Sequence, residues 1–165
     1  MTCFLDMDGV LTDFVGAACA IHGASVPDPW PIGAWDVAPL LDMNASAFWK
    51  PLQHDFWATM PWTDDGKEIL AECERRYGQQ NIVLLTSPCA SPYSASGKIA
   101  WIQRFMNPYR RQYALCPCKQ FMARSDAILI DDSIKNCKHF IACGGYAKLV
   151  TRPWNQEDEE LDRWS

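Results

Sequence analysis

Two aspartates stand directly after a strongly apolar run near the start of the chain. Asp6 and Asp8 follow the run Thr2–Leu5, and Gly9 allows the chain to turn sharply beyond them. Two carboxylates at this spacing, just past a strand, can both face the same crevice. A turn with two solvated aspartates is the plainer interpretation, but it fits poorly because Asp6 directly follows residues typical of a buried strand. The pair is therefore a candidate for chemistry.

A second pair of aspartates, Asp131 and Asp132, follows the apolar run Ala127–Ile130. Paired carboxylates at this depth need a cation or a proton in order to coexist. Magnesium takes oxygen ligands and suits a substrate that carries phosphate. The alternative is that these acids favour the dipole at the start of a helix capped by Ser133, and both interpretations can hold together.

Two hydroxyl side chains, Thr86 and Ser87, follow a third apolar run, Asn81–Leu85. Hydroxyls at the end of a strand can donate hydrogen bonds to a phosphate oxygen. Because Thr-Ser-Pro is also an ordinary turn, this pair supports the aspartates and does not define a site by itself.

The elements that must position these residues can be predicted from the hydrophobic pattern. Strands are predicted over Thr2–Leu5, Asn81–Leu85, Gln112–Leu115, Ala127–Ile130 and Tyr146–Val150. Helices are predicted from Asp13 to Gly23, around Phe48 and around Phe56, from Asp64 and Asp65 to Gly78, over Ser94–Met106 and from Ser133 onward. This alternation favours a parallel sheet with helices on both faces, whose ligands bind beyond the carboxyl ends of the strands. Asp6, Thr86 and Asp131 all fall at such ends.

Composition narrows the function classes. The chain has 165 residues, 48% hydrophobic and 21% charged, which indicates one globular domain with room for one insertion. With a net charge of −5 and no basic run, it is not expected to bind extended nucleic acid.

No apolar run is long enough to span a membrane. Cys116 and Cys118 are too close for a normal disulfide and no CxxC pair exists, so we expect a reducing, cytoplasmic location.

The run Asp6–Asp13 (DMDGVLTD), the Thr86-Ser87 pair and the Asp131-Asp132 pair resemble, in order and spacing, the haloacid dehalogenase-like (HAD) phosphatases. A closer resemblance, to the 5'(3')-deoxyribonucleotidases, rests on DMDGVL, Thr86-Ser87-Pro88, Lys98 with Trp101, Ile130-Asp131-Asp132 and Arg152-Pro153-Trp154-Asn155. The resemblance implies an α/β fold with a Rossmann-like three-layer core and a parallel five-stranded sheet. Residues 1–13 and 63–165 would form this core, and residues 14–62 a small helical cap inserted after the first strand.

The resemblance also implies roles for the aspartates. Asp6 would attack phosphorus and form a phospho-aspartate, and Asp8 would protonate the leaving oxygen and then activate water. The cofactor would be Mg²⁺, bound by Asp6, the main-chain carbonyl of Asp8 and Asp132. Asp131 and Asn136 would support these ligands.

Phosphate binding falls, by the same resemblance, to Thr86, Ser87, Gly9 and a lysine. Two lysines are candidates, and spacing favours Lys119, which precedes the last aspartate pair, over Lys98. Lys98 would then be a surface residue or a supporting residue on its helix.

The segment between the first motif and the helix that opens at Asp64 is rich in aromatic residues, and a nucleobase stacks well on such rings. Phe14, Trp35 and Trp49 are the candidates for substrate binding. Most of the other rings in the segment are expected to form the core of a small cap, because large rings build a core efficiently.

The sequence therefore predicts a magnesium-dependent phosphomonoesterase, a 5'(3')-deoxyribonucleotidase that acts on nucleoside monophosphates. The alternatives are a HAD phosphatase for another small phosphomonoester, such as a sugar phosphate, and a non-catalytic binding module. One departure affects substrate detail: Cys89 and Ala90 stand where mammalian members commonly carry a lysine. The preferred base and sugar, the 5' or 3' position of the phosphate and a homodimeric state are left open.

Overall fold

The computed structural model describes residues 1–31, 34, 36–156 and 161–164. Its centre is a parallel five-stranded sheet in the order β3-β2-β1-β4-β5. The strands are β1 (Thr2–Leu5), β2 (Ile82–Thr86), β3 (Tyr113–Leu115), β4 (Ala127–Asp131) and β5 (Tyr146–Leu149). All five predicted strands are confirmed, each to within about one residue at either end, because short apolar runs bounded by polar residues are typical of strands.

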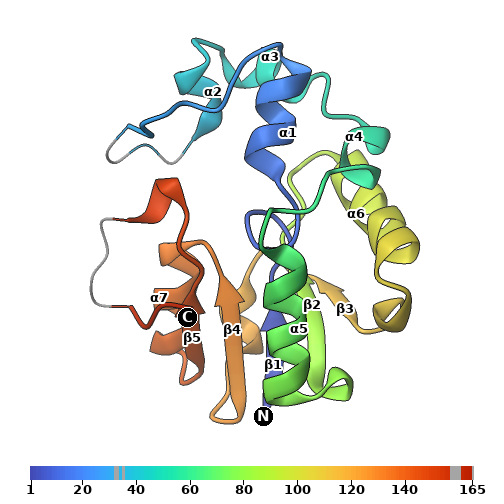
Figure 1. The fold of residues 1–165 in the computed structure, drawn as a ribbon, viewed down its shortest axis with the longest axis vertical. Helices are drawn as coiled ribbons and strands as arrows, with labels where there is room; N and C mark the ends of the chain where they lie inside the picture. Colours follow the sequence, from blue (N-terminus) through green and yellow to red (C-terminus); the bar gives the residue numbers. More distant parts are fainter. Residues whose placement is uncertain (32–33, 35, 157–160, 165) are drawn as a thin grey trace.

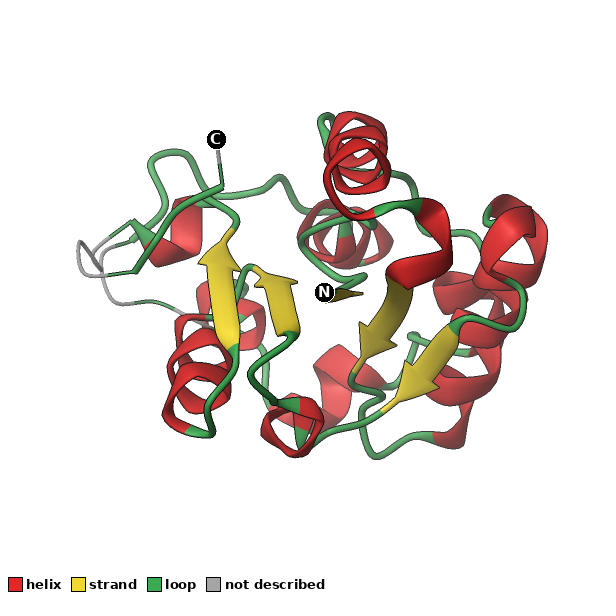
Figure 2. Ribbon diagram, turned by 90° about the horizontal axis from the view of Figure 1, so that it is seen from below, coloured by secondary structure: helices red, strands yellow, loops and turns green. Residues whose placement is uncertain are grey.

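Helices cover both faces of the sheet (Figure 2). They are α1 (Phe14–Ile21), α2 (Val37–Leu40), α3 (Ala45–Trp49), α4 (His54–Ala58), α5 (Gly66–Tyr77), α6 (Pro92–Phe105) and α7 (Ile134–Ala142), with 3₁₀ turns η1 (Gln79–Asn81), η2 (Asn107–Tyr109), η3 (Lys119–Met122) and η4 (Pro153–Asn155). Alternate residues of β1 serve the two faces: Cys3 and Leu5 pack in one cluster with Ile69 of α5, whereas Phe4 packs with Phe140 of α7. The predicted three-layer α/β core is confirmed.

Helix starts largely follow the predicted caps. The side chain of Asp13 accepts a hydrogen bond from the Gly16 amide, and that of Ser133 accepts one from the Asn136 amide. Helix α6 begins two residues earlier than predicted, at Pro92, because the side chain of Ser91 caps it by accepting a hydrogen bond from the Tyr93 amide.

Helix α2 was not predicted. It lies in the Pro- and Trp-rich stretch that showed no clear period, and its four residues are too few to display one. The Asp36 side chain accepts a hydrogen bond from the Ala38 amide and so begins the helix.

Helices α1 to α4 form the insertion between β1 and α5, and Figure 1 shows α1, α2 and α3 above the upper, carboxyl ends of the strands. Helix α4 instead lies against α6 of the core. A β-carbon at Gly97 of α6 would lie 2.4 Å from the β-carbon of Trp57, so this close contact requires glycine. The boundaries of a separate cap over residues 14–62 stay a prediction. Within the described residues, no helix has the length and apolar character needed to cross a membrane.

Candidate active site

The carboxyl ends of the central strands bring the two aspartate pairs together. Leu5 of β1 is in register with Leu84 of β2 and with Ile130 of β4, so Asp6 and Asp131 leave the sheet side by side. The chain runs from β1 outward through β2 to β3 and then returns to β4 on the other side of β1. Open α/β sheets bind ligands at such a reversal of strand order.

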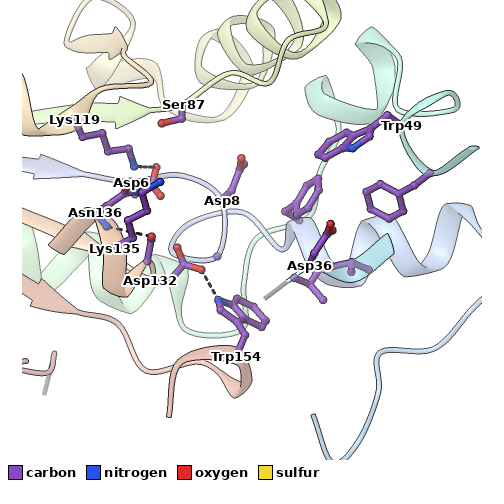
Figure 3. Close-up of a pocket in the computed structure, with 16 residues that line it drawn as sticks. Asp6, Asp8, Asp36, Trp49, Ser87, Lys119, Asp132, Lys135, Asn136 and Trp154 are labelled. Carbon is purple, nitrogen blue, oxygen red and sulfur yellow. Dashed lines mark hydrogen bonds and ion pairs between the residues drawn. The ribbon is translucent and has the colours of Figure 1, made fainter. Parts of the chain in front are cut away.

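The carboxylates of Asp6, Asp131 and Asp132 form a buried cluster in which one oxygen from each lies within 4.8 Å of the others. Lys119, on η3, is buried against them. Its Nζ lies 2.6 Å from Asp6 Oδ1 and 2.7 Å from Asp131 Oδ2, as Figure 3 shows for the pair with Asp6. One lysine therefore pairs with two of the three carboxylates.

Asp131 is held entirely by protein donors. Besides Lys119, it accepts hydrogen bonds from the amide of Ser133 at 2.8 Å and from Nδ2 of Asn136 at 3.2 and 3.3 Å. Asp132 differs, because no cation within the described part of the chain pairs with it. Its Oδ2 accepts a hydrogen bond of 2.7 Å from the indole Nε1 of Trp154.

The electrostatics of the cluster favour a cation. Burial raises the pKa of Asp6 to about 7; Lys119 opposes this rise, while Asp131 and Asp8 add to it. Burial, with the charges of Asp131 and Asp6, also raises the pKa of Asp132 well above its usual value. Although burial lowers the pKa of Lys119, the carboxylates outweigh it and hold that pKa above its usual value.

The pKa values of Asp6 and Asp132 are raised because the site is buried and negative charge is in excess there. A divalent cation would neutralise that excess, and three carboxylates offer the oxygen ligands that Mg²⁺ prefers. The residues present therefore fit a magnesium ion, with Asp132 and Asp6 less committed to protein donors than Asp131.

The carboxylate of Asp8 forms an ion pair with a second lysine, Lys98. The Nζ of Lys98, on α6, lies 2.5 Å from Asp8 Oδ2, 2.9 Å from the Thr86 hydroxyl oxygen and 2.8 Å from the main-chain carbonyl of Ser87. Asp8 Oδ1 also accepts a hydrogen bond from the Thr12 hydroxyl. Lys98 is completely buried, so its interpretation as a surface residue is wrong. It joins the first motif to the Thr-Ser pair.

Gly9 brings its main chain directly against Asp132. Its φ is +74°, a conformation that favours glycine, and a β-carbon there would lie 2.2 Å from Asp132 Oδ2. On the other side, the Arg152 guanidinium donates from Nε to the Gly9 carbonyl and binds both carboxylate oxygens of Asp65.

A cavity of about 520 Å³ lies above this cluster, between the sheet and the insertion (Figure 3). The predicted site residues that line it are Asp6, Asp8, Gly9, Phe14, Trp49, Ser87, Lys119, Asp132 and Asn136. Thr86 and Asp131 are buried and do not line the cavity, and Trp35 lies outside the described residues. The functional role of each residue stays a prediction.

The wall opposite the carboxylates is aromatic. Phe14, Phe48 and Trp49 line the cavity, and Trp49 is 39% exposed. The ring of Phe14 stacks on Trp57 with centroids 5.5 Å apart, while Trp57 itself is buried and does not line the cavity. The rings thus divide into a lining set and a set that packs behind it.

Two charged residues that line the cavity, Lys135 and Asp36, were missed by the sequence interpretation. Lys135 is exposed at the start of α7, and no described residue accepts a hydrogen bond from it or pairs with it. Its position three residues beyond Asp132 could have suggested it. Asp36 lines the cavity from the insertion, and nothing in the local pattern of that stretch indicated it.

Solved structures of HAD hydrolases have a fold similar to that of this chain. A HAD family hydrolase from Deinococcus radiodurans R1, solved with bound phosphate and sodium, is 14% identical with a TM-score of 0.54, covering 90% of this chain and 79% of that one. CbbY from Rhodobacter sphaeroides in complex with phosphate is 14% identical with a TM-score of 0.53, covering 98% and 92%. At such identities the likeness shows the fold alone.

Sequence comparison places the family. No curated protein sequence matches the chain. The family model described as "5' nucleotidase, deoxy (Pyrimidine), cytosolic type C protein" matches residues 1–165. Because that match spans every residue, the chain belongs to this family of 5'-nucleotidases, on a HAD hydrolase fold, and is a phosphoric monoester hydrolase.

Proposed function

We propose that the protein hydrolyses deoxyribonucleoside monophosphates with Mg²⁺ as cofactor and a phospho-aspartate on Asp6 as intermediate. The observation that carries this proposal is one cavity with two unlike sides, a cluster of buried carboxylates with a lysine and a wall of aromatic rings. The first suits the phosphate of a nucleotide, and the second suits the flat face of its base.

The reaction would proceed in two displacements at phosphorus. An oxygen of Asp6 attacks phosphorus, the bond to the nucleoside oxygen breaks, and Asp8 gives a proton to that leaving oxygen. Water then attacks the phospho-aspartate, Asp8 takes the proton from this water, and inorganic phosphate leaves with the Asp6 carboxylate restored. Lys98 holds Asp8 at the side of the cavity through the contact of 2.5 Å.

Asp6, Asp132 and the main-chain carbonyl of Asp8 would hold Mg²⁺, which would reduce the repulsion between the anionic nucleophile and the anionic substrate. Lys119 and the hydroxyl of Ser87, which both line the cavity, would bind the phosphate, and Thr86, which is buried behind them beside Lys98, would support this site from within the core. The hydrogen bonds from Asn136 keep Asp131 in place beside them.

Phosphate release from a panel of substrates tests the proposal. The panel holds dTMP, dUMP, dCMP, dAMP and dGMP, their ribose counterparts, several sugar phosphates and a generic aryl phosphate, each measured with Mg²⁺ and with EDTA. Release from the nucleotides that favours the deoxy forms and disappears with EDTA is the expected result. The isosteric variant D6N is the control for contaminating phosphatases.

Two other results would redirect the proposal. Magnesium-dependent release from sugar phosphates or the aryl phosphate, but from no nucleotide, would keep the chemistry and make another small phosphomonoester the substrate. Equal release with Mg²⁺ and with EDTA would reject the metal.

A further inference from the structure

The segment Arg152–Asn155 contacts the two loops that follow β1 and β4 and carry the aspartates of the site. Arg152 donates to the carbonyl of Gly9, and Nδ2 of Asn155 donates to the main-chain carbonyl of Asp132 at 2.8 Å. Between them, Trp154 directs its indole at the Asp132 carboxylate, as the dashed line in Figure 3 shows. Asp132 is therefore held at both its main chain and its side chain by one short segment.

The carboxylate of Asp132 is confined between two groups. On one side, the main chain of Gly9 approaches so closely that only glycine fits. On the other, the indole Nε1 of Trp154 donates to Oδ2 at 2.7 Å. Asp132 is 8% exposed, so little water is available to replace that donor. Rotation of the carboxylate would lose the hydrogen bond or bring Oδ2 against Gly9.

We propose that Trp154 is a positioning residue for the metal ligand Asp132, and that its indole N–H fixes the carboxylate for a divalent cation. The inference rests on the metal binding proposed above and adds a residue to it. Groups that hydrogen-bond to metal ligands typically change metal affinity by about 10- to 100-fold when they are removed.

The ring of Trp154 has a second set of contacts that a test must separate from the N–H. It packs edge-on against Trp30 of the insertion, with centroids 5.5 Å apart. Trp30 uses its own indole N–H for the carbonyl of Ala34, at 2.7 Å, and not for the site. The two tryptophans therefore form a matched pair: each donates one hydrogen bond, but only that of Trp154 reaches a metal ligand.

The test measures the binding of Mn²⁺, which takes the same oxygen ligands as Mg²⁺, by electron paramagnetic resonance of the free ion. We expect W154F, which keeps an aromatic ring and loses the donor, to bind Mn²⁺ about tenfold more weakly than wild type. The variant W154L loses the ring as well. Its affinity for Mn²⁺ should be at most about twofold lower than that of W154F. W30F should bind as wild type does, and thermal melting confirms that each variant is folded.

Wild-type affinity in W154F together with weak binding in W154L would overturn the inference, because the ring alone would then matter. A measurement on the unmodified protein guards against a damaged fold: the indole ¹⁵N–¹H signal of Trp154 should shift on addition of Mg²⁺ while that of Trp30 stays. If the wild-type protein binds no Mn²⁺, the proposed metal site itself is rejected. If wild type and W154F bind Mn²⁺ equally, only the role of Trp154 is rejected.

Discussion

The two sides of the cavity are built in different ways. At the sheet, Asp6, Asp131 and Lys119 are buried and joined by contacts of 2.6 and 2.7 Å, so each of these three charged groups has a partner of opposite charge. At the insertion, Phe14 and Trp49 meet through ring contacts, with centroids 6.1 Å apart. Ring contacts tolerate small displacements that a buried ion pair does not. The sheet side is thus suited to one reaction, and the aromatic side to the choice of substrate.

The comparison predicts that changes at the sheet side reduce turnover or stability, whereas changes at the insertion reduce substrate affinity. The largest effect is expected for D6N, which removes the nucleophile and keeps the shape of the side chain. Turnover should fall by at least about a thousandfold, since loss of a covalent nucleophile commonly costs more than that. Steady-state kinetics with the nucleotide that wild type prefers, beside circular dichroism as a check of the fold, would measure it. Turnover near the wild-type level would disprove covalent catalysis by Asp6.

The two buried lysines should differ in what their loss does to stability. K119M leaves both Asp6 and Asp131 buried without their cation, and we expect a loss of about 3–5 kcal/mol in the free energy of unfolding. K98M should lose less, because the Asp8 side chain is 27% exposed and can be solvated. Urea unfolding of the metal-free proteins measures both. Equal losses would show that the two pairs are equivalent.

Metal binding should weaken as the pH falls. Burial raises the pKa of Asp6 to about 7, and a ligand must be deprotonated to bind metal, so protons compete with the ion below that pH. Between pH 8 and pH 6 the deprotonated fraction of such a group falls about tenfold, and Asp132 adds to the loss. Calorimetric titration with Mg²⁺ at several pH values measures this. A constant affinity over this range would contradict the pKa of Asp6.

On the aromatic side, W49L should raise KM for nucleotides without a matching fall in kcat. Stacking of a base on one ring is worth about 1–3 kcal/mol, so an increase of about tenfold is expected. The aryl phosphate should show a smaller change. F56L is the matched control, because the ring of Phe56 packs against Phe14, with centroids 6.1 Å apart, and does not line the cavity. Equal effects of the two variants would indicate general loosening of the insertion.

The smallest effect is expected at Lys135, which faces the cavity without a partner among the described residues. K135Q should raise KM for nucleotides by a few-fold, since an exposed cation attracts a phosphate only weakly through water. K138Q, on the same helix and away from the cavity, removes the same charge and should change KM less. A shift in KM that does not diminish with added salt would contradict a role through charge.

Much of the fold followed from local pattern. The apolar runs at Thr2–Leu5 and Ala127–Ile130 predicted their strands because a parallel strand is buried on both faces. The capping residues Asp13 and Ser133 predicted helix starts because each offers a side-chain oxygen to a free amide. Helix α2 escaped prediction because four residues show no periodicity.

The sequence by itself determined the types of the candidate site residues and their place at strand ends, since motif spacing and hydrophobic runs are local properties of the chain. The tertiary structure alone decided which groups meet across long separations: Lys98 with Asp8, Trp154 with Asp132, and Arg152 with Gly9. These pairs depend on strand order and on how the tail returns to the sheet. Those are packing outcomes, in which a contact forms only after distant segments have been buried together, and no local pattern encodes them.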